Sequence, residues 1–111
     1  MELPILIRKN YPTLTALCER HQVTTLHVFG SVLNERFRPD SDLDFLVTFG
    51  AVESEAYADN YFDLRDALSP LFQRKIDLLK SQTLQNPHLK HIVENFKVLV
   101  YARGQSAQMA A

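Results

Sequence analysis

The sequence predicts an α/β or α+β domain, in which helices cover one small mixed sheet of about four strands. Apolar residues recur at helical spacing in several segments of the chain. Short apolar runs lie between these segments and end at turn-forming residues, as strands do. Strands that alternate with helices favour a single covered sheet. The connection after Leu79 is not a simple crossover, so we expect both parallel and antiparallel strand pairs.

The first half of the chain is expected to contain a helix and two strands. Pro12 suits the first turn of a helix, and the apolar spacing after it predicts a helix over residues 12–20. A buried strand is expected over residues 25–29, followed by a short helix over residues 31–35. Residues 42–49 alternate as a strand does. One face of this strand would carry Leu43, Phe45, Val47 and Phe49, and the other would carry Asp42, Asp44, Leu46 and Thr48.

The second half is expected to contain two helices and two strands. The first helix has Pro70 near its end and Phe72 beyond it, and Pro87 opens the second helix. Short strands are expected over residues 75–79 and 97–101. The buried face of the first helix is marked by Tyr57, Tyr61, Leu64, Leu68 and Leu71.

Length and composition favour one globular domain. The chain has 111 residues, of which 46% are hydrophobic. We expect residues 1–104 to form this domain and residues 105–111 to form a disordered C-terminal tail. The formal net charge of -1 argues against strong nucleic-acid binding by the isolated domain. No apolar run reaches the ~18 residues that span a bilayer. The first charged residues do not precede an apolar segment, as they would in a secretory signal. We therefore expect a cytoplasmic location with no membrane contact.

Gly30 and Ser31 form the first feature that suits a binding site. They come directly after a predicted strand and before a possible short helix. Glycine lets a phosphate approach the backbone closely, and amides at a helix N-terminus favour anions. The Ser31 hydroxyl adds a hydrogen-bond donor. The alternative is an ordinary turn, in which Gly and Ser are common.

Three acidic residues form the second feature. Asp42 and Asp44 are two residues apart in a predicted strand, so their side chains point to the same face. Asp77 is the one acid in a later apolar strand and would join them if the two strands are neighbours. Three close carboxylates repel one another unless cations lie between them, and such oxygens suit Mg²⁺. The alternatives are a solvated turn around Asp42 and an ion pair between Asp77 and a base such as Lys75 or Arg74.

Other reactive residue types are assigned no chemistry. Cys18 lies in a helical apolar pattern and is expected to be a small buried hydrophobe. His88 and His91 have helical spacing, but no further zinc ligand follows at a useful distance along the chain, so a solvated helix face is expected. His27 is expected to be structural.

The spacing of Gly30-Ser31, Asp42-x-Asp44 and Asp77 resembles the DNA-polymerase-β-like nucleotidyltransferase superfamily, and most closely its short bacterial members, the MNT domains. The resemblance covers roughly residues 24–101 and has several separate parts. These parts are residues 29–31, 38–47, 65–68, 74–79, 86–89 and 98–101.

The resemblance implies the polymerase-β-like fold and a metal-dependent transfer of AMP from ATP to an acceptor hydroxyl. In this family Asp42, Asp44 and Asp77 would be catalytic and would hold two Mg²⁺ ions, while Gly30 and Ser31 would bind the nucleotide phosphates. MNT domains act as antitoxins of HEPN-domain proteins, so the implied acceptor is a tyrosine of a HEPN-type partner. The alternatives are a binding-only antitoxin and a small-molecule, aminoglycoside-like adenylyltransferase. A homo- or hetero-oligomer that completes the cleft is also compatible with so short a chain.

Two positions depart from the family's pattern. Members often carry an arginine four residues after the glycine, followed by another glycine. This chain has Asn34 and Glu35 at those positions. The missing cation would have contacted the triphosphate, so the departure bears on catalytic efficiency more than on the fold.

Overall fold

The computed structural model describes residues 3–33, 37–50, 52, 54–81 and 84–103, with the side chain of residue 54 left out. The expected tail at residues 105–111 and the departures at Asn34 and Glu35 lie outside these residues. The helices are α1 (Ile5–Lys9), α2 (Tyr11–Arg20), the short 3-10 helix η1 (Gly30–Leu33), α3 (Ser54–Phe72) and α4 (Pro87–Phe96). The strands are β1 (Val23–Phe29), β2 (Leu43–Phe49), β3 (Ile76–Lys80) and β4 (Val98–Ala102).

The described part of the chain forms a four-stranded sheet in the order β3-β2-β1-β4. Strand β1 pairs antiparallel with both β2 and β4, whereas β2 and β3 run parallel. The mixed α/β sheet expected from the sequence is therefore confirmed. The parallel pair matters for the site, because parallel neighbours in register present matched residues on the same face.

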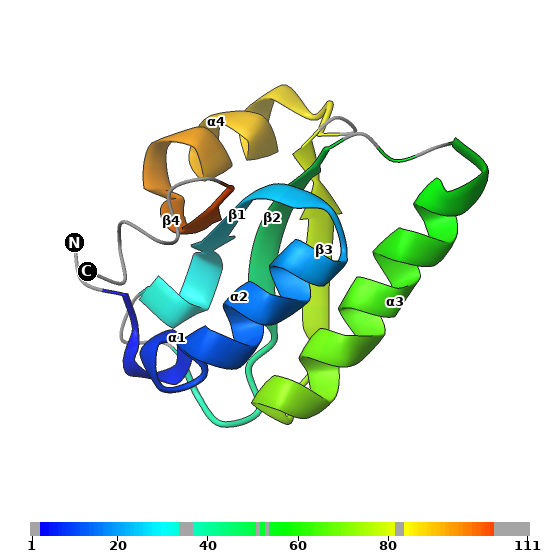
Figure 1. Cartoon of the computed structure of the whole chain (residues 1–111). Coiled ribbons are helices and arrows are strands. Elements are labelled where there is room, and N and C mark those ends of the chain that lie inside the picture. Colours follow the sequence, from blue (N-terminus) through cyan, green and yellow to red (C-terminus); the bar gives the residue numbers. More distant parts are fainter. Residues whose placement is uncertain (1–2, 34–36, 51, 53, 82–83, 104–111) are drawn as a thin grey trace.

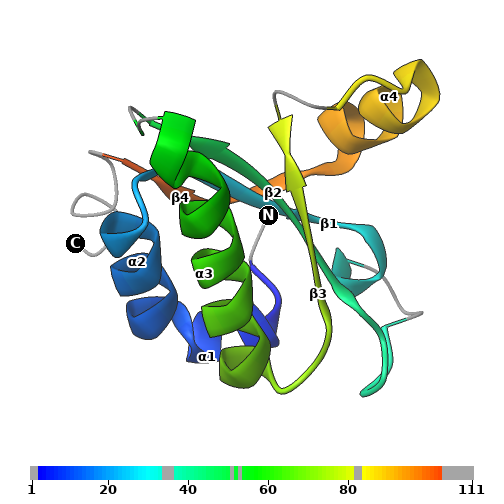
Figure 2. The same ribbon diagram turned by 90° about the vertical axis from the view of Figure 1, so that its right-hand side faces the viewer.

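The sheet is covered on both faces, so the structure has three layers (Figures 1 and 2). Helices α1, α2 and α3 lie on one face, where their apolar side chains pack against β1 and β2 in the main core. Helix α4 lies on the opposite face, where Val93 packs against Phe29 and Leu46 in a smaller cluster. This second face is thus covered over part of its length.

Strand β2 has the two faces that its alternation predicts. Leu43, Phe45 and Val47 are fully buried against the helices. Asp44 and Thr48 lie on the other face and are half-buried. One strand therefore serves both the main core and the face that carries the acidic residues.

Three expectations about the elements need correction. Helix α3 continues through Pro70 to Phe72, whose ring is buried 5.8 Å from that of Phe45, so Phe72 is not beyond the helix. The turn after β1 is a 3-10 helix that begins at Gly30 rather than at residue 31. Helix α1 was not expected, and its Ile7 is fully buried in the main core.

None of the described helices has both the length and the apolar content needed to cross a bilayer.

Candidate active site

Strands β2 and β3 bring two of the predicted acidic residues together. Asp44 and Asp77 are direct partners in the parallel register. Because they are in register, their side chains lie on the same face of the sheet, opposite to α3. Asp77 is exposed and Asp44 is half-buried. From the sequence these strands are only possible neighbours, and the register establishes their pairing.

The electrostatics of Asp44 show that negative charge is crowded at this point. Its pKa is raised from 3.8 to about 6, first by burial and then by the neighbouring charges of Asp77 and Asp42. A hydrogen bond with the Asp77 side chain acts in the same direction. The site therefore favours a proton, or another cation, between these carboxyl groups.

Asp42 lies immediately before β2, and its carboxylate contacts a lysine. Its Oδ2 is 3.9 Å from Nζ of Lys75, and both side chains are largely exposed. An exposed pair at this distance contributes little to stability. Lys75, which the sequence offered as a partner of Asp77, thus contacts Asp42, and Arg74 contacts the preceding loop instead (below).

Gly30 lies against the acidic residues at the end of β1. Phe29 is the register partner of Asp44, so the chain turns into η1 beside that carboxylate. Gly30 has a φ of +80°, and an added Cβ would overlap Oδ2 of Asp44. Glycine is therefore required here by the Asp44 side chain as well as by the backbone conformation. Ser31 follows in η1 and is half-buried.

The donor set suits a hard cation such as Mg²⁺, because it consists of carboxylate oxygens whose mutual repulsion contributes to the raised pKa of Asp44. Within the described residues, no three Asp, Glu, His or Cys side chains are already gathered closely enough to hold an ion. The side chain of Asp42 is instead turned toward Lys75. The fit to a metal therefore depends on Asp42 exchanging its weak lysine contact for the ion.

The nucleotidyltransferase domain family matches residues 13–100. The chain belongs to the nucleotidyltransferase family. The resemblance expected from the spacing of glycine and aspartates is thus confirmed, and the chain is a nucleotidyltransferase.

Relatives and solved structures agree with this assignment. One relative, from Methanocaldococcus jannaschii, is named as an inferred protein adenylyltransferase. It is 31% identical to this chain over 99 residues, and the match covers 89% of this chain and 95% of the relative. A solved structure, described as an inferred minimal nucleotidyltransferase, is 31% identical to this chain with a TM-score of 0.69. The match covers 88% of this chain and 95% of the chain in that structure.

A more distant neighbour shares the fold. It is the structure of a tri-AMPylated HEPN toxin in complex with an MNT antitoxin from Shewanella oneidensis. The TM-score is 0.60 at 14% identity, with 92% of this chain and 77% of that chain covered. At this identity the similarity shows the nucleotidyltransferase fold alone.

Proposed function

We propose that this nucleotidyltransferase transfers AMP from ATP to a hydroxyl group of a partner protein. The observation that carries the proposal is the Asp44–Asp77 register pair beside Gly30, where burial and then the charges of Asp77 and Asp42 raise the pKa of Asp44 to about 6. Perturbed carboxyl groups next to a glycine turn suit phosphate chemistry better than a structural role. The names of the relatives as protein adenylyltransferases support the choice of reaction.

Asp42, Asp44 and Asp77 would hold two Mg²⁺ ions, which supply charge neutralisation of the triphosphate and activation of the acceptor hydroxyl. The backbone of Gly30 and the hydroxyl of Ser31 would bind the terminal phosphates. The acceptor oxygen then forms a bond to the α-phosphorus, while the bond from this phosphorus to the pyrophosphate oxygen breaks. Asp77 lies on the outer strand and is exposed, so it is placed to take the acceptor proton. Pyrophosphate leaves.

The acceptor is proposed to be a tyrosine of a HEPN-type protein. The described chain consists of one sheet and its covering helices, which leaves the exposed side of Asp77 free for a second protein. The AMPylated HEPN toxin held by a protein of the same fold supports this choice. On this account the chain is an antitoxin that silences its partner by modification, with ATP and the HEPN protein as its ligands.

The test uses intact-mass measurement of a co-encoded partner after incubation with the chain, ATP and Mg²⁺. We expect a mass increase of one or more AMP units. Asp77→Asn should abolish the increase but keep ATP binding, because Asp42 and Asp44 remain. Asp63→Asn changes an exposed aspartate on α3 and serves as the matched control. Equal neutralisation of the partner by the wild type and the Asp42, Asp44 and Asp77 variants, with no mass change, would replace this proposal by the binding-only antitoxin.

A further inference from the structure

We propose that Arg74 is a positioning residue that holds the backbone of Asp42 in place beside the metal site. This inference rests on the proposed function, since it assumes that Asp42 is a metal ligand. Arg74 contacts the loop before Asp42, and no sequence pattern indicates these contacts.

Arg74 joins the turn between α3 and β3 to the loop that precedes β2. Its Nη1 donates to the carbonyl oxygens of Arg38 and Ser41, both at 3.2 Å. Its guanidinium lies 4.5 Å from the ring centroid of Phe37. The backbone of Arg74 is itself held by Ser69, whose hydroxyl donates to the Arg74 carbonyl at 2.9 Å. The contact therefore runs from the end of a packed helix to the loop.

Arg74 and the backbone of Lys75 together hold the two peptide planes on either side of Asp42. The Ser41 carbonyl belongs to the peptide that leads into Asp42, and Arg74 binds it. The Leu43 amide belongs to the peptide that follows Asp42, and it donates to the Lys75 carbonyl at 3.1 Å. Because each peptide is planar, the two anchored planes define the position of the Asp42 Cα and the direction of its Cα–Cβ bond. The Asp42 carboxylate, which contacts Lys75, can then exchange this contact for a metal ion by rotation of its side chain alone.

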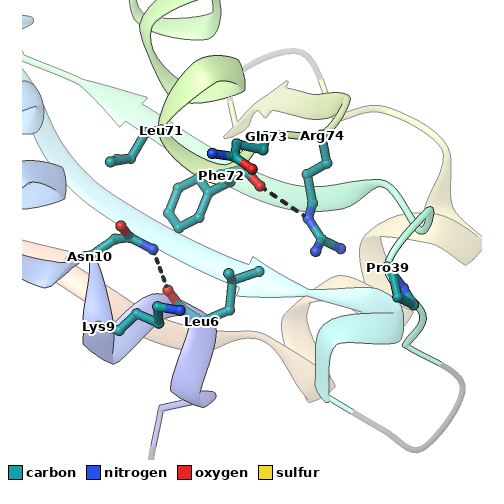
Figure 3. Close-up of a pocket in the computed structure, with 8 residues that line it drawn as sticks. All are labelled: Leu6, Lys9, Asn10, Pro39, Leu71, Phe72, Gln73 and Arg74. Carbon is teal, nitrogen blue, oxygen red and sulfur yellow. Dashed lines mark hydrogen bonds between the residues drawn. The ribbon is translucent and has the colours of Figure 1, made fainter.

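The loop depends on Arg74 because it is short of packing on one side. Its own bonds form a tight turn, in which the Ser41 amide donates to the Arg38 carbonyl at 3.0 Å and the Arg38 amide donates to Ser41 Oγ at 2.9 Å. A cavity of about 400 Å³ lies beside it, lined by Pro39 and Arg74 among others (Figure 3). The side of the turn at Pro39 borders this cavity, so the bonds from the guanidinium add to the packing of Phe37 against the main core.

Arginine suits this position better than lysine. Its Nη1 reaches two carbonyls while the flat guanidinium covers the Phe37 ring. A lysine ammonium is a point charge without this flat face, so it would hold the loop less rigidly.

The test compares Arg74→Gln with Arg65→Gln in the full-length chain. Arg65 lies on α3, and its guanidinium carbon is 4.8 Å from the ring centroid of Phe62. Arg65→Gln therefore also removes a cation–aromatic contact, but this contact lies away from the loop before β2. Two quantities are measured: the dissociation constant for Mn²⁺, used as a probe of the Mg²⁺ site, and hydrogen exchange of the Ser41 and Leu43 amides. We expect Arg74→Gln to weaken Mn²⁺ binding on the order of tenfold, as is typical when a group that orients a metal ligand is lost. Both amides should exchange faster.

The outcomes separate this inference from the proposed function. Wild-type Mn²⁺ affinity in Arg74→Gln, or unchanged exchange at Ser41 and Leu43, would overturn the role of Arg74 while leaving AMP transfer intact. A wild-type chain that transfers no AMP but shows the exchange difference would overturn the proposed function instead. AMP transfer by Arg74→Gln should recover at saturating Mg²⁺, whereas transfer by Asp42→Asn should not. If Arg74 only stabilised the fold, excess Mg²⁺ would not restore transfer. If Arg74→Gln does not fold, Arg74→Lys keeps the charge and should show the same changes at smaller size.

Discussion

The two faces of strand β2 contribute to the protein in opposite ways. On the face toward α3, Leu43, Phe45 and Val47 are fully buried in the main core. On the other face, Asp44 is half-buried beside Asp77, and its raised pKa reports an unfavourable environment for its charge. The first face stabilises the fold, whereas the second gives up stability at Asp44 for a site that attracts cations. Substitutions of Phe45 and of Asp44 should therefore change stability in opposite directions.

The largest effect is expected on the core face. Phe45→Ala removes a fully buried ring that lies 5.8 Å from the ring of Phe72. The free energy of unfolding should fall by about 3–5 kcal/mol, as for other large-to-small changes in cores. Urea denaturation measures this loss. AMP transfer per folded molecule should stay close to wild type, and a selective loss of transfer would show that the two faces are not separable.

Gly30→Ala should damage the site face with a smaller loss of stability. The new Cβ would overlap Oδ2 of Asp44, and the φ of +80° is unfavourable for alanine. We expect a loss of about 1–3 kcal/mol in unfolding free energy, typical of a strained backbone position. Transfer should fall far more than stability does, because Asp44 must move. Thermal melting together with a transfer assay checks both, and normal transfer would show that Asp44 is not held against Gly30.

Asp44→Asn should make the chain without metal more stable, while abolishing transfer. The amide removes a charge that burial, Asp77 and Asp42 all disfavour. The gain should be on the order of 1 kcal/mol once solvent screening is allowed for. Asp42→Asn is the matched comparison, and it should gain less because Asp42 is exposed and pairs with Lys75. Melting curves in chelator that rank the two variants in the opposite order would contradict the electrostatic account.

The smallest effect is the pH dependence of that gain. The pKa of Asp44 is raised to about 6, so the folded chain holds this proton more tightly than the unfolded chain, and ionisation destabilises the fold. The advantage of Asp44→Asn over wild type should therefore be absent below pH 3.8 and grow until about pH 6. Metal affinity should rise through the same range, because the ion must displace the proton. The difference in melting temperature between the two proteins, measured against pH in chelator, tests this sign.

The sequence predicted the parts of the fold that depend on local pattern. The alternation of Leu43, Phe45 and Val47 with Asp44 gave both faces of β2, and the Gly30 turn and the Asp77 strand were also placed. The prediction of the end of α3 is wrong, because a proline commonly marks the end of a helix. Here the helix continues past Pro70 to Phe72, whose ring is buried next to that of Phe45.

Contacts between segments that are distant in the chain could not be predicted from the sequence. The pairing of Asp44 with Asp77 requires that β2 and β3 are neighbours in the sheet, and the sequence does not show which strands are neighbours. The bonds from Arg74 to Arg38 and Ser41 span 36 and 33 residues, and no periodicity marks them. The requirement for glycine at position 30 was assigned to phosphate approach, while the structure adds the Asp44 carboxylate as a cause.

The central claim is that the acidic face binds nucleotide through metal and is separable from the core. It is tested most directly by calorimetric titration of ATP into the wild type and Asp44→Asn, with Mg²⁺ and with excess chelator. The account predicts that ATP binds the wild type tightly when Mg²⁺ is present and weakly in chelator, with little change in the circular dichroism melt on removing the metal. Asp44→Asn should stay folded and bind ATP weakly in both conditions. Tight ATP binding in chelator, or wild-type binding by Asp44→Asn, would contradict the claim.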